Sequence, residues 1–419
     1  MEPEKRARAH IARLDLDKRQ SAVLDGQAHT ARALWNLLHE YFTFRQGRFA
    51  SLKQCDEAIR AARHEIEWMK ELPAQAAQAV LKTYRQAWAN FFNPDHPAKR
   101  PTFKGRFRSR MAVDIPQARD LQIKRVNRRW GAVSLPKVGR VRFRWTKDLP
   151  GLTKDAPAGR ITGARLVKDA FGWQIVFRTQ TTAAVLAPAH PGPVVGIDRG
   201  ITVALALSDG TTREHGPWLT GGERERLRRL EKKAARRRAP GQPASHRLIR
   251  TYAQIARLRA TAKRRAVDWQ HQTTTELAEV FSMVVVEDLH ITNMVRSAKG
   301  TIEQPGRNVA QKAGLNRAIT GEGWGRTVTL LGYKTADRGG QVIKVPAPGT
   351  SITCHRCGHR DATSRNGIRF ACSNPVCAWT GHADTNAAIN IRNAAGTVVS
   401  GRGDLGAARS VKRQPPRAA

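Results

Sequence analysis

The chain has 419 residues, 40% of them hydrophobic, and carries 73 Lys and Arg against 34 Asp and Glu. The net charge of +39 predicts a polyanionic partner, most simply nucleic acid, although a cationic secreted protein or a structural protein of an RNA particle has a similar charge. No apolar run approaches the ~20 residues that a membrane span needs, and the polar N-terminus lacks the pattern of a secretory signal. We therefore expect a cytoplasmic protein of about two to four domains with no membrane partner.

The first hundred residues have helical periodicity. Apolar residues recur at helical spacing over 24–42, after a possible capping box formed by Asp17 and Gln20. A second helix is expected around 55–72, and a third begins near Pro73 and ends at the sequence "NPDHP". We expect the aromatic residues of these helices to be core residues rather than a surface on which bases stack.

From about residue 111 the pattern changes to short strands. A hairpin is predicted to turn near 169–172, and the proline-rich residues 187–193 indicate a domain boundary. Beyond it we expect two antiparallel strands with an Asp-Gly turn at 209–210, a continuous apolar strand in "FSMVVVEDL" and another strand in "GQVIKVPA". The helices expected here are a basic one near 221–238, a long one over 246–281 and a last one that begins at "ADTNAAINIRNAA".

Four of the five cysteines form two pairs late in the chain. Cys354 and Cys357 are separated by two residues, Cys372 and Cys377 by four, and the two pairs by fourteen. Four thiolates at such a spacing are typical of one tetrahedral zinc ion, with unligated thiols or another metal as alternatives. His355, His359 and His382 are possible substitute ligands, but four thiols already complete the site. The wider second pair must loop out, whereas Cys55 stands alone.

Three carboxylates lie at or near the ends of apolar elements. Asp198 follows "VVGI", Glu287 ends "MVVVE", and Asp384 opens the last helix. Each acid alone is weak evidence, because an Asp after a strand is more often a cap or turn residue, and Glu287 with Asp288 could be an acidic pair that ends a strand. As a set they suit magnesium, which prefers oxygen ligands, and two such ions can activate water against a phosphodiester. We therefore predict a catalytic, magnesium-binding triad of Asp198, Glu287 and Asp384.

This order of acids resembles the RuvC nuclease domain, of the RNase H-like fold, and most closely that of the TnpB proteins encoded by transposons and of the related compact type V CRISPR effectors. The resemblance rests on "GIDRG", "VVVEDLHITNM", "GHADTNAAINI" and the entry "TSITCHRCGHR" to the cysteine motif. The segments "PAQAAQAVLKTYRQAWANFF" and "RPTFKGR" resemble the N-terminal part of the same family. The resemblance covers most of the chain and is strongest over 194–395.

The resemblance implies a fold of the α/β class with additional all-β and helical parts. The implied division is a wedge-like β-barrel at 1–20 and 111–190, a helical recognition lobe at 21–110, a RuvC-like nuclease domain at 191–350 and 379–396, an inserted zinc ribbon at 351–378 and a disordered basic tail at 397–419. The ribbon then orders the connection before the last helix, and so fixes where Asp384 points.

The resemblance also implies the activity: an RNA-guided, magnesium-dependent endonuclease that cuts double-stranded DNA beside a short flanking motif, in a prokaryotic, nucleoid-associated setting. The expected cofactors are two catalytic magnesium ions and one structural zinc ion. Basic residues over 224–238 and 257–265 are expected to follow an RNA–DNA duplex, unless they form solvated helix faces. The alternatives are a guided or RNA-binding protein that docks on DNA without cutting, and an unguided, transposase-like nuclease; the oligomeric state stays open.

Overall fold

The computed structural model describes residues 5–43, 51–106, 109–152, 158–182 and 189–400. The chain divides into two compact units, the first comprising Met1–Val185 and Tyr252–Ala260, the second Leu186–Thr251 and Thr261–Ala419. No helix in the described residues combines the length and apolar character that crossing a membrane requires.

The first unit is built on a seven-stranded sheet with the order β2-β6-β7-β1-β5-β4-β3. The strands are β1 (Lys5–Asp15), β2 (Ala112–Ile115), β3 (Lys124–Arg125), β4 (Trp130–Leu135), β5 (Gly139–Arg144), β6 (Gly159–Asp169) and β7 (Gly172–Thr182). The longest pairing is the β6–β7 hairpin, in which Asp169 lies opposite Gly172 and the glycine has a φ of 114°. The hairpin predicted near 169–172 is therefore confirmed.

Helices complete the first unit. They are α1 (Lys18–Thr43), α2 (Leu52–Glu65), η1 (Glu67–Glu71), α3 (Ala74–Phe92) and η2 (Ala118–Leu121). The predicted capping box is present, because the backbone N–H groups and side chains of Asp17 and Gln20 bond reciprocally at 3.2 and 2.7 Å. Trp35 packs edge-on against the fully buried Tyr84, so these helix aromatics are core residues as expected.

The second unit contains a five-stranded mixed sheet with the order β10-β9-β8-β11-β12. Its strands are β8 (Val194–Asp198), β9 (Leu205–Leu207), β10 (Thr212–Arg213), β11 (Met283–Glu287) and β12 (Gln341–Val345). The central β11 pairs in parallel with both β8 and β12, and its middle three residues are buried. Such a strand has both faces covered, which explains its uninterrupted run of valines.

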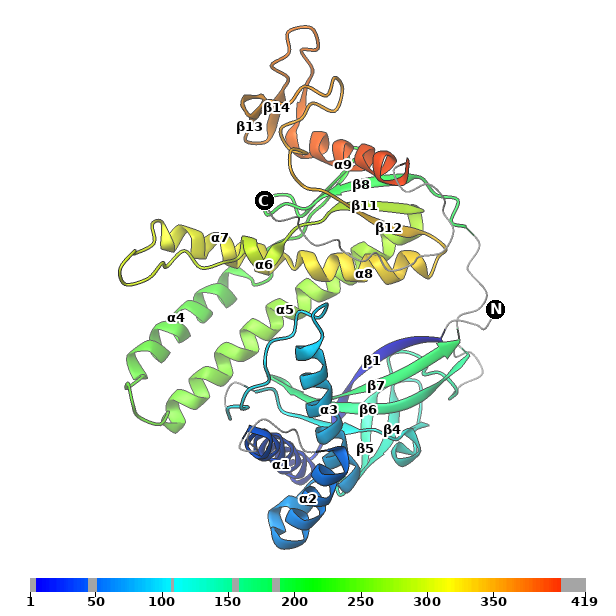
Figure 1. The fold of residues 1–419 in the computed structure, drawn as a ribbon, viewed down its shortest axis with the longest axis vertical. Helices are drawn as coiled ribbons and strands as arrows, with labels where there is room; N and C mark the ends of the chain where they lie inside the picture. The colour runs from blue at the N-terminus through cyan, green and yellow to red at the C-terminus, as the bar shows by residue number, and fades with distance from the viewer. Residues whose placement is uncertain (1–4, 44–50, 107–108, 153–157, 183–188, 401–419) are drawn as a thin grey trace. The chain divides into compact units, whose positions relative to one another are not determined.

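Helices cover the two faces of this sheet, as Figure 1 shows for α8 and α9. The helices that lie wholly or mostly in the second unit are α4 (Gly221–Arg237), α5 (His246–Val280, of which Tyr252–Ala260 belong to the first unit), α6 (Ile291–Met294), α7 (Val309–Glu322), α8 (Trp324–Ala336) and α9 (Ala383–Ser400). Val284 and Val286 pack with Leu277 of α5 and Leu331 of α8. Val285, which points the opposite way, packs with Ile391 of α9. One face is thus covered by α5 and α8, and the other by α9.

Between β12 and α9 lies a small sheet with the order β13-β14-β15. Its strands are β13 (Arg365–Asn366), β14 (Arg369–Ala371) and β15 (Thr380–His382), preceded by the short helix η3 (Ala362–Ser364). Strand β15 runs directly into α9, whose first residue, Ala383, donates its backbone N–H to Ile368 O at 2.8 Å. This small sheet therefore fixes the start of α9.

The sequence predictions differ from the structure in three details. The helix expected over 55–72 ends at Glu65, because Ile66 is extended, and a short 3-10 helix follows. The Asp-Gly turn at 209–210 joins β9 to β10, so three strands rather than two form this segment. Of the disordered tail expected over 397–419, residues 397–400 instead continue α9; the rest of the tail, from 401 onward, lies outside the described residues, as do residues 187–188 of the expected boundary.

Candidate metal site and cysteine cluster

Asp198 and Glu287 end neighbouring parallel strands. Ile197 of β8 lies in register with Val286 of β11, so the two acids follow at the same sheet edge. Adjacent strands are about 4.8 Å apart, and alternate residues point to the same face. Glu287 therefore shares the face of Val285, which is the face covered by α9. Both acids are half-buried, whereas the three residues before each of them are buried.

Asp384 reaches this face from α9. The helix approaches β8 so closely that a Cβ atom on Gly196 would lie 2.1 Å from Ala388 O. Gly196 and Asp198 are two residues apart on one strand and share a face, while Asp384 and Ala388 are one helical turn apart and share a face. The close contact at Gly196 therefore brings Asp384 toward the edge that carries Asp198. Three distant segments of the chain converge at this edge.

The electrostatics of Asp198 confirm that the acids influence one another. The pKa of Asp198 is raised to about 7, first by burial and then by the negative charges of Glu287 and Asp384. Protonation or a bound cation relieves such mutual repulsion, and a divalent ion with oxygen ligands suits three carboxylates. The donor set therefore fits magnesium.

Arg365 is a residue of this site that sequence reasoning missed. From β13 its guanidinium donates to Asp384 Oδ1 at 2.8 Å, and its positive charge lowers the pKa of Asp198. The sequence signal was weak, because several arginines occur in the same segment. Two strand pairings could have placed Arg365 near Asp384 if they had been predicted. Strand β13 pairs with β14, and β14 pairs with β15, which leads into α9.

Two further contacts hold the Glu287 end of the site. The buried Arg199 donates a hydrogen bond from its guanidinium to the Glu287 carbonyl oxygen, which ties the end of β8 to that of β11. On the side chain, Thr350 donates its hydroxyl to Glu287 Oε1 at 2.5 Å. Both the backbone and the carboxylate of Glu287 are therefore restrained.

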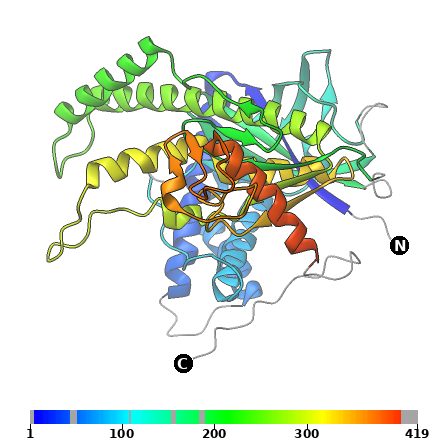
Figure 2. The same cartoon turned by 90° about the horizontal axis from the view of Figure 1, so that it is seen from above.

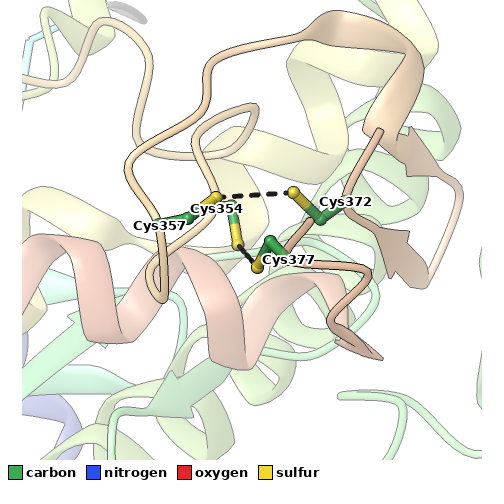
Figure 3. A group of neighbouring side chains, drawn as sticks. All are labelled: Cys354, Cys357, Cys372 and Cys377. Atoms are coloured by element: carbon green, nitrogen blue, oxygen red, sulfur yellow. Dashed lines mark hydrogen bonds between the residues drawn. The ribbon is translucent and has the colours of Figure 1, made fainter. Parts of the chain in front are cut away.

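The four predicted cysteines come together in one cluster (Figure 3). Their sulfur atoms all lie within 4.8 Å of one another, with Cys354 to Cys377 at 3.9 Å and Cys357 to Cys372 at 3.6 Å. Zn–S bonds of about 2.3 Å in a tetrahedron place sulfurs about 3.8 Å apart, so the spacing fits zinc. Among the described residues, the three carboxylates do not form a group this compact.

Backbone donors surround the cysteine cluster. The N–H of His359 bonds to Cys357 and is the main cause that lowers the pKa of this thiol to about 7, whereas burial is the main cause that raises the pKa of Cys372 to about 12. The histidines considered as substitute ligands have other partners: His355 bonds to Asn386, His359 to Ser373, and His382 accepts the N–H of Asp384. The four thiols are therefore the ligand set that the structure favours.

Outside Tyr252–Ala260, the basic helix α5 lies beside the basic helix α4 in the second unit (Figures 1 and 2). Some of their arginines are engaged in ion pairs: Arg265 bonds to Glu223 at 2.6 Å, and Arg228 to Glu225 at 2.9 Å. Many other basic residues of α4 are exposed. That these residues contact nucleic acid stays a prediction.

The fold and the two sites define a strongly basic, mixed α/β protein with a four-cysteine cluster whose spacing fits zinc. Residues 324–391 match the family model "Cas12f1-like, TNB domain", and residues 174–298 match the model "Probable transposase". The chain is 34% identical over 357 residues to "Putative RNA-guided DNA endonuclease InsQ" of Escherichia coli (strain K12), covering 84% of this chain and 82% of that protein. It belongs, with this relative, to the TnpB family.

Other relatives are more distant. A "Putative RNA-guided DNA endonuclease" of Streptomyces pristinaespiralis is 28% identical over 81% of this chain and 76% of its own length. The solved structure described as a Cas12f1–sgRNA–target DNA complex is 15% identical, with 90% of this chain and 83% of that chain covered and a TM-score of 0.47. A TM-score this low does not support an inference about the fold.

Proposed function

We propose that this protein is an RNA-guided, magnesium-dependent DNA endonuclease with Asp198, Glu287 and Asp384 as its metal-binding residues. One observation carries the proposal: the half-buried Asp198 lies at a sheet edge that Glu287 and Asp384 also approach, from β11 and α9, and the negative charges of these two acids raise its pKa. Membership of a family with relatives named as RNA-guided DNA endonucleases supports the same function.

The second unit is then a RuvC-like domain of the RNase H-like fold. Its mixed sheet, with acids at the ends of β8 and β11 and at the start of α9, is consistent with this fold. The proposed domains are a wedge-like barrel at 1–20 and 111–190, a helical recognition lobe at 21–110, the nuclease domain at 191–350 and 379–396, and a zinc ribbon at 351–378. In this proposal the four cysteines hold one structural zinc ion.

The proposed chemistry assigns each residue a task. Two magnesium ions held by the three acids would supply an activated water and stabilise the leaving oxygen of a phosphodiester. In this proposal Asp198, whose pKa is raised by the charges of the other two acids, would be the ligand shared by both ions. Arg365 keeps a positive charge beside Asp384, and its guanidinium offers donors that suit a phosphate oxygen.

The proposed partners are a guide RNA and double-stranded target DNA with a short flanking motif. A net charge of +39 supports polyanion binding, and exposed arginines of α4 offer contacts to phosphates. Contacts of this kind follow the shape and charge of a duplex, whereas the guide supplies the sequence.

Purified protein tests the proposal. We expect RNA of discrete size to copurify, and a plasmid that matches this RNA beside a randomised flank to be cut when magnesium is added. Cutting should disappear in Asp198→Ala and persist in Glu303→Ala, a control that removes an exposed acid of the same unit.

Each other outcome selects an alternative. RNA-dependent binding to the plasmid without cutting would make the protein a guided docking protein. Cutting without any RNA requirement would make it an unguided nuclease. Cutting that survives in Asp198→Ala would remove the proposed site.

A further inference from the structure

Thr350 contacts Glu287 from a segment 63 residues further along the chain. The Thr350 hydroxyl lies 2.5 Å from Glu287 Oε1 and 3.1 Å from Ala347 O. A hydroxyl has a single proton, so it donates mainly to one of these two acceptors. The ionised carboxylate is the stronger acceptor and the closer one, and it takes the bond.

Asn390 of α9 fixes the backbone that carries Thr350. Its Nδ2 donates to Thr350 O at 2.9 Å and to Thr353 O at 2.6 Å. Asn386, one helical turn earlier, also donates from Nδ2 to Thr353 O, at 2.8 Å. Residues four apart share a helix face, so two amides of α9 hold one short stretch of chain. The helix that carries Asp384 therefore also holds the segment that holds Glu287.

Asn386 extends these contacts to the cysteine cluster. Its Oδ1 accepts from the backbone N–H of His355 at 2.9 Å and bonds to His355 Nδ1 at 3.0 Å. His355 lies between Cys354 and Cys357. Asn386 is fully buried, and both of its polar atoms are engaged. It is therefore a structural link and not a metal ligand.

We infer that Thr350 is a positioning residue for Glu287, and that Asn390 and Asn386 hold Thr350 in place from α9. This inference rests on the proposed metal site, of which Glu287 is one ligand. The bond from Thr350 fixes one oxygen of the Glu287 carboxylate. Because the carboxylate is rigid, this bond also sets the direction in which the second oxygen points. Hydrogen-bond partners of ligating carboxylates commonly contribute about 10–100-fold to metal affinity.

Metal binding without nucleic acid tests this inference directly. We would titrate the full-length, zinc-loaded protein with Mn²⁺ and measure free Mn²⁺ by electron paramagnetic resonance. Thr350→Val keeps the shape and removes the donor, and it should weaken Mn²⁺ binding by about 10-fold or more. Thr350→Ser restores the donor and should bind like the wild type. Thr329→Val is the control, since Thr329 bonds only to Gly325 O of its own helix among the bonds described.

Asn390→Leu tests the link to α9. It removes both amide donors, so it should weaken Mn²⁺ binding in the same direction as Thr350→Val. The double variant, Thr350→Val with Asn390→Leu, should have nearly the same Mn²⁺ affinity as whichever single variant binds Mn²⁺ less tightly, because both residues act on the same contact to Glu287. Unchanged zinc content and unfolding temperature would show that the variants are folded.

The outcomes separate the two proposals. Wild-type affinity in Thr350→Val, or fully additive losses in the double variant, would overturn the positioning role while the proposed nuclease site stands. A wild-type protein that binds no Mn²⁺, together with Asp198→Ala that cuts normally, would overturn the proposed function itself.

Discussion

Arg365 forms an ion pair with Asp384 at 2.8 Å, linking the small sheet that carries the cysteine cluster to the first turn of α9. The same guanidinium lowers the pKa of Asp198, which burial and the two other acids raise. Arg365 therefore offsets part of the repulsion within the carboxylate site. The raised pKa of Asp198 leads to two predictions: one concerns the pH dependence of cleavage and the other the pH dependence of stability.

The first prediction concerns Arg365→Ala. Without the guanidinium, the pKa of Asp198 should rise further above about 7, so that a larger fraction of Asp198 is protonated near neutral pH. Metal binding requires the carboxylate, and the acid limb of the pH–rate profile should move up by about one unit. Arg369→Ala, which changes an exposed arginine of the adjacent strand, should leave this midpoint in place. An unmoved midpoint in Arg365→Ala would contradict the assignment.

The second prediction concerns stability. The pKa of Asp198 is raised from 3.8 to about 7 in the folded protein, so the unfolded chain loses this proton first as the pH rises. Wild-type stability should therefore fall between about pH 4 and pH 7, by at most about 4 kcal/mol for three pKa units. The Asp198→Asn variant should not lose stability over this pH range, because an amide side chain does not ionise.

Thermal unfolding checks the second prediction. In buffer without added divalent ions, Asp198→Asn should unfold at a higher temperature than the wild type at pH 8, and the two should agree near pH 4. Added magnesium should narrow the gap at pH 8, because it stabilises only the wild-type site. If the difference in unfolding temperature between Asp198→Asn and the wild type does not change with pH, the pKa of Asp198 is not raised in the folded protein.

The third prediction concerns Gly196. A Cβ atom there would meet two backbone atoms, Ala388 O at 2.1 Å and Arg392 N at 2.5 Å, and neither can rotate away. Gly196→Ala should therefore cost roughly 1–3 kcal/mol of unfolding free energy and displace α9. Because α9 carries Asp384, cleavage should fall even at temperatures where the variant is folded.

Gly221→Ala is the matched control for this variant. Gly221 opens α4, and nothing lies within 4 Å of the position its Cβ would take. Alanine has the higher helix propensity, so this variant should be as stable as the wild type or slightly more stable. If Gly196→Ala and Gly221→Ala cleave DNA equally well, the close approach of α9 to β8 does not determine the position of Asp384.

The sequence was informative where chemistry coincides with local pattern. Asp198 and Glu287 end apolar runs, and a run of four or five apolar residues is enough to predict a buried strand. The cysteine spacing specifies its own cluster in the same way. These elements and the meeting of the four thiols are confirmed by the structure.

Arg365 and Thr350 were not predictable in this way. Each contacts its acid across many residues, through pairings that neither hydrophobic period nor composition encodes. The position of Arg365 follows from the register of β13 with β14, and that of Thr350 from two asparagines on α9. Nothing local distinguishes either residue from an ordinary surface arginine or threonine. Contacts of this kind depend on tertiary structure.

The last prediction links the cysteine cluster to catalysis. Strand β15 leads without a loop into α9, and its pairing with β14 depends on the segment that the cysteines close. Cys372→Ser should reduce bound zinc from about one ion per chain to near zero. It should also lower cleavage by about 10-fold or more, although Cys372 is no ligand of the carboxylate site, because the start of α9 and hence Asp384 loses its anchor.

Zinc content by atomic absorption and plasmid cutting measure the two effects, with Cys55→Ala, outside the cluster, as the control. Full activity in a folded, zinc-free Cys372→Ser protein would show that α9 keeps its position without the metal.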